Sequence, residues 1–436
     1  MDLIFFSGLV NLFFWLIVFF ITLLYLRVPI YHPFFIYLIY HFIGYILRPF
    51  FIYSQKGSFL WNRIGVYPEN MDILILTVIS NVALISVFFG FIAGAGGFKK
   101  LEMPQSFYIT VKKPIYFSIT LIILVALGLY ANYVSMKGAG LDSVLAYQTS
   151  VDSTGGARLV GTSGYITAWA EFLPPICILL FMIPKIRKLA VLLISAYVIM
   201  RFFAGAQRLA FVIVIAGVFF YYLISKKQRY PSVFFVIFLI FFSYIFDIIG
   251  GDRLAMRKLA LGEVTITEIL QNHKDTRGDN ALTSDVVEYD VAASTLNVIH
   301  NYSEYSYGTQ YLRILIWPIP RQIWQDKPVY TSIVNLNEYG DFRYLTTGIY
   351  ADSYMAFSYI SLTIIMFILG YFFSRMYNVL LHSDSVVMIL FYWIVLIFTK
   401  TILRDGGVTF IYFWVFSLIP ILLLSYLGRL KVVRLK

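Results

Sequence analysis

The stretch Leu3–Leu26, LIFFSGLVNLFFWLIVFFITLLYL, decides the class of this protein. None of its 24 residues is charged, and a helix needs about 20 predominantly apolar residues to cross the roughly 30 Å of hydrocarbon in a bilayer. The run lacks a basic leader and a small-residue cleavage site, and it is longer than the apolar core of a signal peptide. We therefore expect it to be retained as a first membrane-spanning helix.

The composition of the whole chain is also that of a membrane protein. Of its 436 residues, 60% are hydrophobic and 13% are charged, whereas a soluble domain has about 45–50% apolar and about 25% charged residues. The single Cys177 lies in an apolar segment, which excludes a disulfide framework or a thiolate metal cluster within the chain. The formal charge of +11 falls in short clusters between apolar runs. We interpret these clusters as orientation signals and not as a nucleic-acid surface.

Similar apolar runs recur along the chain and predict an all-α, polytopic membrane bundle of about eleven transmembrane helices. After Leu3–Leu26 they are Pro33–Tyr53, Asp72–Ala95, Ile115–Ser135, Gly164–Ile183, Leu189–Ala204, Leu209–Ser225, Val233–Ile249, Asp352–Phe373, Val386–Leu403 and Thr409–Leu427. The chain is thereby divided into residues 1–249 with eight helices, a large polar loop at 250–347, and residues 348–436 with three helices and a basic tail.

The distribution of Lys and Arg over the short connections predicts the orientation. Alternate connections and the C-terminal tail contain sixteen of these residues, and the remaining short connections contain six. Because cytoplasmic loops carry the excess, we expect the C-terminus in the cytoplasm and the N-terminus outside. The loop at 250–347, with twelve Asp or Glu and nine Lys or Arg, then lies on the outer face, and we expect it to be partly helical and functional.

Charged side chains at the edge of the hydrocarbon are costly and mark candidate functional positions. On the predicted topology most of them lie toward the outer side, which predicts an outward-facing polar cavity. Arginine binds phosphate oxygens in pairs and stays protonated, so Arg208, Arg253, Arg321 and Arg404 are candidates to hold a diphosphate. Alternatively, each arginine reaches the lipid headgroups or pairs with a neighbouring acid, as Arg404 could with Asp405. The outer-side set is Arg48, Arg208, Asp247, Arg253, Asp352, Arg404 and Asp405.

The most specific stretch of the chain combines three pieces. They are Tyr307-Gly308, then Ile319-Pro320-Arg321-Gln322-Ile323-Trp324-Gln325-Asp326-Lys327-Pro328, then Ala351-Asp352-Ser353-Tyr354 with Phe357. This pattern resembles the outer-loop signature of oligosaccharide repeat-unit polymerases, the Wzy-type O-antigen and exopolysaccharide polymerases. The late position of the long outer loop, Gly205 to Arg208, and the Arg-Asp-Gly-Gly before the final span are similar to that family too. The motif covers about fifty residues and the architecture most of the chain.

The resemblance implies a GT-C type membrane glycosyltransferase that needs no metal or other cofactor. It would transfer a glycan from undecaprenyl diphosphate to the sugar of another lipid-linked repeat unit, at the outer face of the bacterial cytoplasmic membrane. Arg208, Arg253 and Arg321 would stabilise the departing diphosphate, and Asp352 is the first candidate for the base that activates the acceptor hydroxyl. The expected substrate-binding residues are Arg404, Lys327, Arg313, Arg48, His300, Trp324 and Tyr307.

Some assignments within this resemblance have alternatives. Where the family often has Gly-Glu, this chain has Ala351-Asp352, and the alternative role of Asp352 is an ion pair with Arg321 or Arg343. His300 is a second candidate base, because a loop histidine is important in the related O-antigen ligases. Glu288-x-Asp290 has the spacing of a divalent-metal pair, but such pairs are frequent in exposed loops.

Other functions compete with the polymerase. An O-antigen ligase would use the same donor, although the Pro-Arg-x-x-Trp-x-x-Lys-Pro stretch favours a polymerase. A lipid-linked sugar flippase or carrier would keep polar groups near the bilayer midplane, where Glu171, Arg201 and Lys400 are candidates. The expected partners are the lipid-linked donor and acceptor and membrane lipids, with a chain-length regulator and a flippase as further candidates and no nucleic acid.

Overall fold

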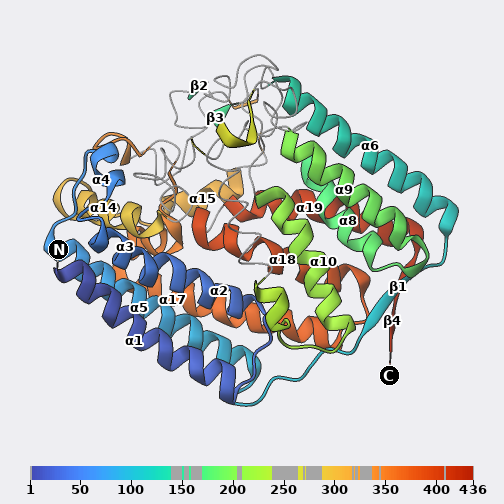
Figure 1. Ribbon diagram of the computed structural model, residues 1–436, viewed down its shortest axis with the longest axis horizontal. Helices are drawn as coiled ribbons and strands as arrows, with labels where there is room; N and C mark the ends of the chain where they lie inside the picture. The colour runs from blue at the N-terminus through green and yellow to red at the C-terminus, as the bar shows by residue number, and fades with distance from the viewer. Residues whose placement is uncertain are drawn as a thin grey trace.

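The computed structural model is predominantly helical, with 76% of it in helices and little sheet (Figure 1). It describes residues 2–138, 150–151, 157–158, 169–203, 209–237, 264–268, 271, 287–316, 319, 323–324, 336–342, 345–406 and 409–435. Within these ranges, six helices are long and apolar enough to cross a membrane. The prediction of a membrane-embedded helical protein is therefore confirmed at this level.

Two of the six are composite, because π-helical turns interrupt them. The first is α1 (Asp2–Phe20) with η1 (Ile21–Tyr25), and the second is α2 (Pro33–His41) with η2 (Phe42–Leu47) and α3 (Arg48–Ser54). The others are α5 (Asn70–Ala95), α6 (Pro114–Gly138), α17 (Gly348–His382) and α18 (Val386–Asp405).

Shorter helices complete the bundle, and those at 169–181, 187–203, 209–225 and 409–428 correspond to further expected spans. The eighth expected span, Val233–Ile249, is described only up to residue 237, where 233–237 are helical. The shorter elements are α4 (Phe59–Ile64), η4 (Trp169–Phe172), α8 (Leu173–Phe181), η5 (Pro184–Ile186), α9 (Arg187–Phe203), α10 (Leu209–Ser225), α14 (Glu288–Asn301), α15 (Thr309–Ile316) and α19 (Thr409–Gly428).

Helices α5 and α17 lie side by side (Figure 1) because glycines line their contact. A Cβ atom at Gly370 would lie 2.0 Å from the carbonyl oxygen of Val87, and one at Gly90 would lie 2.0 Å from that of Phe367. No side chain fits at such distances, so backbone packs directly against backbone, as is common between helices in a membrane. The two helices run parallel and therefore begin at the same end of the bundle.

A two-stranded sheet closes one end of the bundle, which we call the β1 end. Strand β1 (Phe107–Val111) pairs antiparallel with β4 (Leu430–Arg434), so that Ile109 lies opposite Val432. Several connections rich in Lys and Arg meet here. For example, Arg229 donates to the Leu101 carbonyl oxygen at 2.9 Å, and the Ile109 N–H donates to the Met182 carbonyl oxygen at 3.0 Å. A second, two-residue pair joins β2 (Ser150–Val151) to β3 (Ala157–Arg158).

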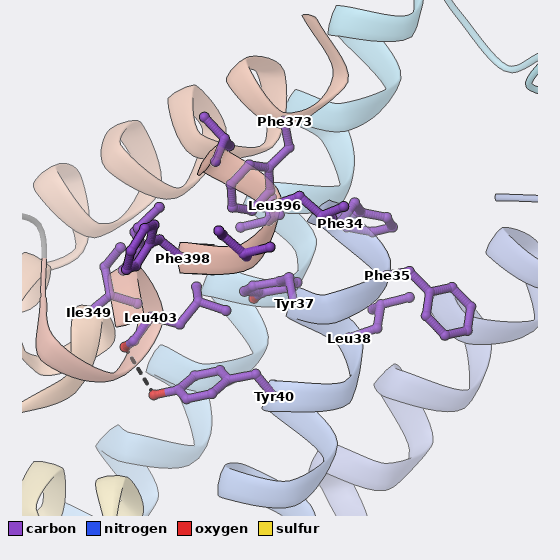
Figure 2. Close-up of a cluster of buried hydrophobic side chains, with 14 of the residues drawn as sticks. Phe34, Phe35, Tyr37, Leu38, Tyr40, Ile349, Phe373, Leu396, Phe398 and Leu403 are labelled. Carbon is purple, nitrogen blue, oxygen red and sulfur yellow. Dashed lines mark hydrogen bonds between the residues drawn. The ribbon is translucent and has the colours of Figure 1, made fainter. Parts of the chain in front are cut away.

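The opposite end, at which α5 and α17 begin and α18 ends, contains α14 and is called the α14 end (Figure 1). Beneath it, α2 packs against α17 and α18 through buried side chains that include Phe34, Leu38, Phe373 and Leu396 (Figure 2). Polar contacts join the same helices. The Tyr40 hydroxyl donates to the Leu403 carbonyl oxygen at 3.0 Å, as the dashed line in Figure 2 shows.

Candidate functional site

Helix α14 is the centre of the polar end of the bundle. Every residue from Glu288 to Ile299 is buried, although the segment belongs to the region that we expected to be an outer loop. It packs against η2, α4, α5 and α17. A buried helix with charged residues in its first turn needs partners for those charges, and they come from distant parts of the chain.

A bidentate ion pair fixes the start of α14. Arg48 donates from Nε to Asp290 Oδ2 at 2.7 Å and from Nη2 to Oδ1 at 2.9 Å, and both side chains are buried. The Ser58 hydroxyl also donates to this carboxylate, and Trp61 Nε1 donates to the Asp290 carbonyl oxygen at 3.1 Å. A fork of charge-assisted bonds in a dry site holds two elements in one geometry. Arg48 is therefore buried in an ion pair that joins α3 to α14, and it does not lie on an open surface.

The same contacts define the surroundings of the Glu288-x-Asp290 pair. Asp290 accepts three side-chain hydrogen bonds and faces Arg48. Among the described residues, no cluster of three or more His, Cys, Asp or Glu side chains has the arrangement of a metal site. The pair is therefore a buried structural feature and not an exposed acidic loop.

Glu288 is buried beside the tyrosine-rich face of α2 and η2. Burial raises the pKa of its carboxyl from 4.5 to about 7, and the positive charges of Lys400 and Arg404 act in the opposite direction. A Cβ atom at Gly44 would lie 4.0 Å from Glu288 Oε2, and within the described residues this oxygen has no hydrogen-bond partner. The same holds for the buried Tyr45 hydroxyl. The Glu288 carboxyl is thus poised to change charge near neutral pH.

The other end of α14 carries a histidine held by a carboxylate. His300 Nδ1 lies 3.0 Å from Asp72 Oδ1, and His300 Nε2 lies 3.4 Å from the Tyr354 hydroxyl. The second oxygen of Asp72 accepts from Asn297 Nδ2 at 2.9 Å and from the Glu69 N–H at 2.8 Å. An ionised carboxylate can only accept, so Nδ1 carries the proton and the neutral ring keeps a lone pair on Nε2.

This arrangement makes His300 a structurally oriented proton acceptor. The Asp72 carboxylate fixes the tautomer and would stabilise the imidazolium that forms when Nε2 takes a proton. The His300 side chain is 25% exposed and that of Asp72 is 4% exposed, so the imidazole ring is accessible and the carboxylate is sheltered. The sequence offered His300 as a candidate but gave no indication of Asp72 as its partner.

A break divides α17 just below the site. Phe357 (φ −150°, ψ 44°) and Ser358 (φ +57°, ψ −141°) are not helical. Side chains and a loop amide satisfy the backbone groups that the break frees. The Phe357 N–H donates to Ser361 Oγ at 2.7 Å, and the Ser306 N–H donates to the Met355 carbonyl oxygen at 2.8 Å. Residues 348–356 therefore form a short separate helix that presents the Asp352 and Tyr354 positions.

Within this short helix, Asp352 lies beside the end of α18, whereas Tyr354 contacts His300. Asp352 is 5% exposed, and its Oδ2 lies 3.2 Å from where a Cβ atom of Gly406 would be. Gly406 has φ +84°, which favours glycine, and directly follows Arg404 and Asp405. Arg404 donates from Nε to Asp405 Oδ1 at 2.6 Å and from Nη2 to Oδ2 at 3.1 Å. The structure therefore brings Asp352 next to the C-terminal turn of α18.

Helix α15 covers Asp352 from another side. Gln310 Nε2 donates to the Asp352 carbonyl oxygen at 3.0 Å. Burial raises the pKa of the Tyr311 phenol, and the negative charge of Asp352 raises it further. Tyr311 is therefore neutral at physiological pH beside a carboxylate.

The two predicted aromatic contacts lie on the surface. Tyr307 is 59% exposed and Trp324 is 38% exposed. Tyr307 and Gly308 both have positive φ values, +50° and +77°, and the Tyr307 ring lies 5.9 Å from that of Phe357, centroid to centroid. This exposure suits either a sugar ring or the headgroup layer.

The remaining predicted residues fall outside what the structure describes. Arg208, Arg253, Arg321 and Lys327 lie outside the described residues, as does Arg343, the alternative partner of Asp352. The backbone of Arg313 belongs to α15, but its side chain is not among those described. The predicted diphosphate site thus has one described member, Arg404.

Comparison with protein-family models, curated proteins and solved structures finds no match. The proposed function therefore depends on the sequence motif and on the geometry of the site.

Proposed function

We propose that the protein polymerises lipid-linked oligosaccharide repeat units, with undecaprenyl diphosphate as the leaving group. His300, on which the proposal chiefly depends, is held at Nδ1 by Asp72 and partly open at Nε2. Such a pair is the arrangement expected of a general base that activates a hydroxyl group. Its position on the segment that precedes Tyr307 and Arg321 agrees with the resemblance to repeat-unit polymerases.

The proposed reaction has one group transfer. The acceptor hydroxyl loses its proton to His300 Nε2 as its oxygen attacks the anomeric carbon of the donor glycan. The bond from that carbon to the diphosphate oxygen breaks, and the lipid diphosphate leaves with the electron pair. Arg208, Arg253 and Arg321, together with Arg404, would stabilise the charge that develops on it.

Asp352 is the alternative base in this proposal. Its carboxylate lies beside Gly406 and the Arg404–Asp405 pair, whereas His300 contacts Tyr354 on another side of the same short helix. If His300 is the base, Asp352 acts by positioning the end of α18.

The experiment is reconstitution of the full chain with a defined lipid-linked repeat unit, without added metal, and measurement of the polymer ladder. We expect His300→Ala to reduce the rate by about 10²- to 10⁴-fold and Asp72→Asn to reduce it less. Lys188→Ala, a change at an exposed residue of the β1 end that lies outside this site, is the control and should keep the rate. Wild-type ladders from His300→Ala, together with their loss in Asp352→Asn, would transfer the role of base to Asp352.

The membrane topology in the proposal has eleven spans, with the N-terminus outside and the C-terminus in the cytoplasm. Glu304 is exposed at the α14 end, and the single native Cys177 is buried. A cysteine at Glu304 should therefore react with an impermeant reagent from outside intact cells. Reaction only after permeabilisation would reverse the orientation.

An O-antigen ligase is the second candidate, because the oriented His300 would activate a lipid A core hydroxyl equally well. The two activities differ in their acceptor. Offering the purified protein a lipid-linked repeat unit and a lipid A core together, and identifying which becomes glycosylated, separates them.

A further inference from the structure

A groove opens between the ends of α5 and α17 at the β1 end, far from α14. Its volume is about 820 Å³, within the roughly 300–1,000 Å³ typical of small-molecule sites. Gly94 and Gly96 lie on one wall and Asn378 on the other. Asn378 Nδ2 donates to the Gly94 carbonyl oxygen at 3.3 Å, and Gly96 has φ +76° and turns the chain away from α5. Gly94 also lets the two helices approach closely here, because a Cβ atom at this position would lie 2.7 Å from the Tyr371 carbonyl oxygen.

The groove is basic. Lys99, Arg375 and His382 line it, and its lining contains no Asp or Glu. Lys99 Nζ reaches back to 3.6 Å from where a Cβ atom of Gly96 would lie. In the described part of the chain, neither Lys99 nor Arg375 has an ion-pair partner. The nearby Asp384 pairs with Arg434 at 3.3 Å, so the closest described carboxylate is directed to a cation outside the groove.

Exposed aromatic side chains flank this charge. Phe98 is 52% exposed and Tyr371 is 43% exposed. The guanidinium carbon of Arg375 lies 6.0 Å from the centre of the Tyr371 ring. Aromatic rings next to cations at the end of a membrane helix are typical of the level of the lipid headgroups.

We propose that this groove binds the phosphate of an anionic lipid headgroup from the adjacent leaflet, with the acyl chains along Phe98 and Tyr371. Lys99 and Arg375 contact the phosphate, and the Asn378 amide lies at the base of the groove. Basic pockets between membrane helices bind such headgroups. The competing explanation is that the two cations merely offset the negative ends of the α5 and α17 helix dipoles. The helix-dipole role needs no ligand, so binding measurements distinguish the two explanations.

The test measures binding of phosphatidylglycerol and phosphatidylcholine to the full chain in detergent by native mass spectrometry. The wild type should prefer phosphatidylglycerol. The double variant Lys99→Ala/Arg375→Ala should bind it about 30-fold more weakly, at roughly 1 kcal/mol for each cation. The charge-conserving variant Lys99→Arg/Arg375→Lys should keep the preference. Lys188→Ala removes an exposed cation of the same end outside the groove and should bind like the wild type.

Two further measurements address a double variant that fails to fold and the source of the bound phosphate. If the double variant cannot be purified, Arg375→Gln alone should lose about fivefold in affinity. Equal binding of the two lipids, or wild-type affinity in the alanine variants, would overturn the proposal in favour of the helix-dipole role. Inorganic phosphate that binds as tightly as phosphatidylglycerol would overturn the lipid as ligand.

Discussion

Replacing Glu288 with glutamine should stabilise the protein at alkaline pH. The pKa of its carboxyl is about 7 in the folded protein against 4.5 in the unfolded chain. Between these values the folded state binds more protons than the unfolded state, so this group makes the free energy of unfolding fall as pH rises. The full loss, reached above about pH 8, is about 3 kcal/mol at about 1.4 kcal/mol per pKa unit. Glutamine has nearly the same shape and carries no charge to bury.

The assay is equilibrium unfolding in mixed micelles with increasing SDS, followed by tryptophan fluorescence between pH 5 and pH 8.5. We expect the free energy of unfolding of Glu288→Gln to exceed that of the wild type by up to about 3 kcal/mol at pH 8.5, and the difference to shrink to less than about 1 kcal/mol at pH 5. Glu304→Gln is the control, because Glu304 is exposed on the segment that follows α14.

Two results would refute this reasoning. A difference between Glu288→Gln and the wild type that does not change with pH would mean that the carboxyl does not titrate in this range. A variant less stable than the wild type at pH 8.5 would mean that the ionised carboxylate has a favourable partner, so that burial is not the dominant effect.

Three further substitutions test the packing. Arg48→Met leaves the buried Asp290 carboxylate without its arginine partner and should lower the free energy of unfolding by about 3–5 kcal/mol in the same micelle assay. The double variant Arg48→Met/Asp290→Leu should recover much of this lost stability. Gly370→Leu should prevent the contact of α5 with α17 and abolish recovery of monodisperse protein by size-exclusion chromatography, whereas Gly44→Ala, with no atom closer than 4.0 Å, should be recovered normally. Ser361→Ala frees the backbone N–H at the break in α17 and should lower stability by about 1–3 kcal/mol, with a smaller loss for Ser361→Thr.

Much of the helical framework could be predicted, because hydropathy is a local property of the chain. The apolar run Leu3–Leu26 became the helix Asp2–Tyr25, and Val386–Leu403 became α18 with two more residues. Six of the expected spans are confirmed as long apolar helices among the described residues. The total of eleven spans stays a prediction, since several other spans are short or only partly described. The orientation of the protein in the membrane stays a prediction too.

The site was less predictable, because its contacts join positions far apart in the chain. Asp72 and His300 are 228 residues apart, and Arg48 and Asp290 are 242 apart. Nothing in either local sequence marks the other member. The break at Phe357–Ser358 was missed for another reason. Neither residue is Gly or Pro, and it is the side chains of Ser306 and Ser361 that make a non-helical backbone acceptable there.

The pairing of β1 with β4 can form only late in the synthesis of the chain. Thr110 and its partner Lys431 are 321 residues apart, and ribosomes add roughly 5–20 residues each second. The β1 edge therefore stands open for roughly 15 to 65 seconds of synthesis, and unpaired strand edges invite wrong partners. Until β4 emerges, the connections at this end must be held by their other hydrogen bonds. Truncated reporter fusions that end before Leu430 would trap the protein in that open state.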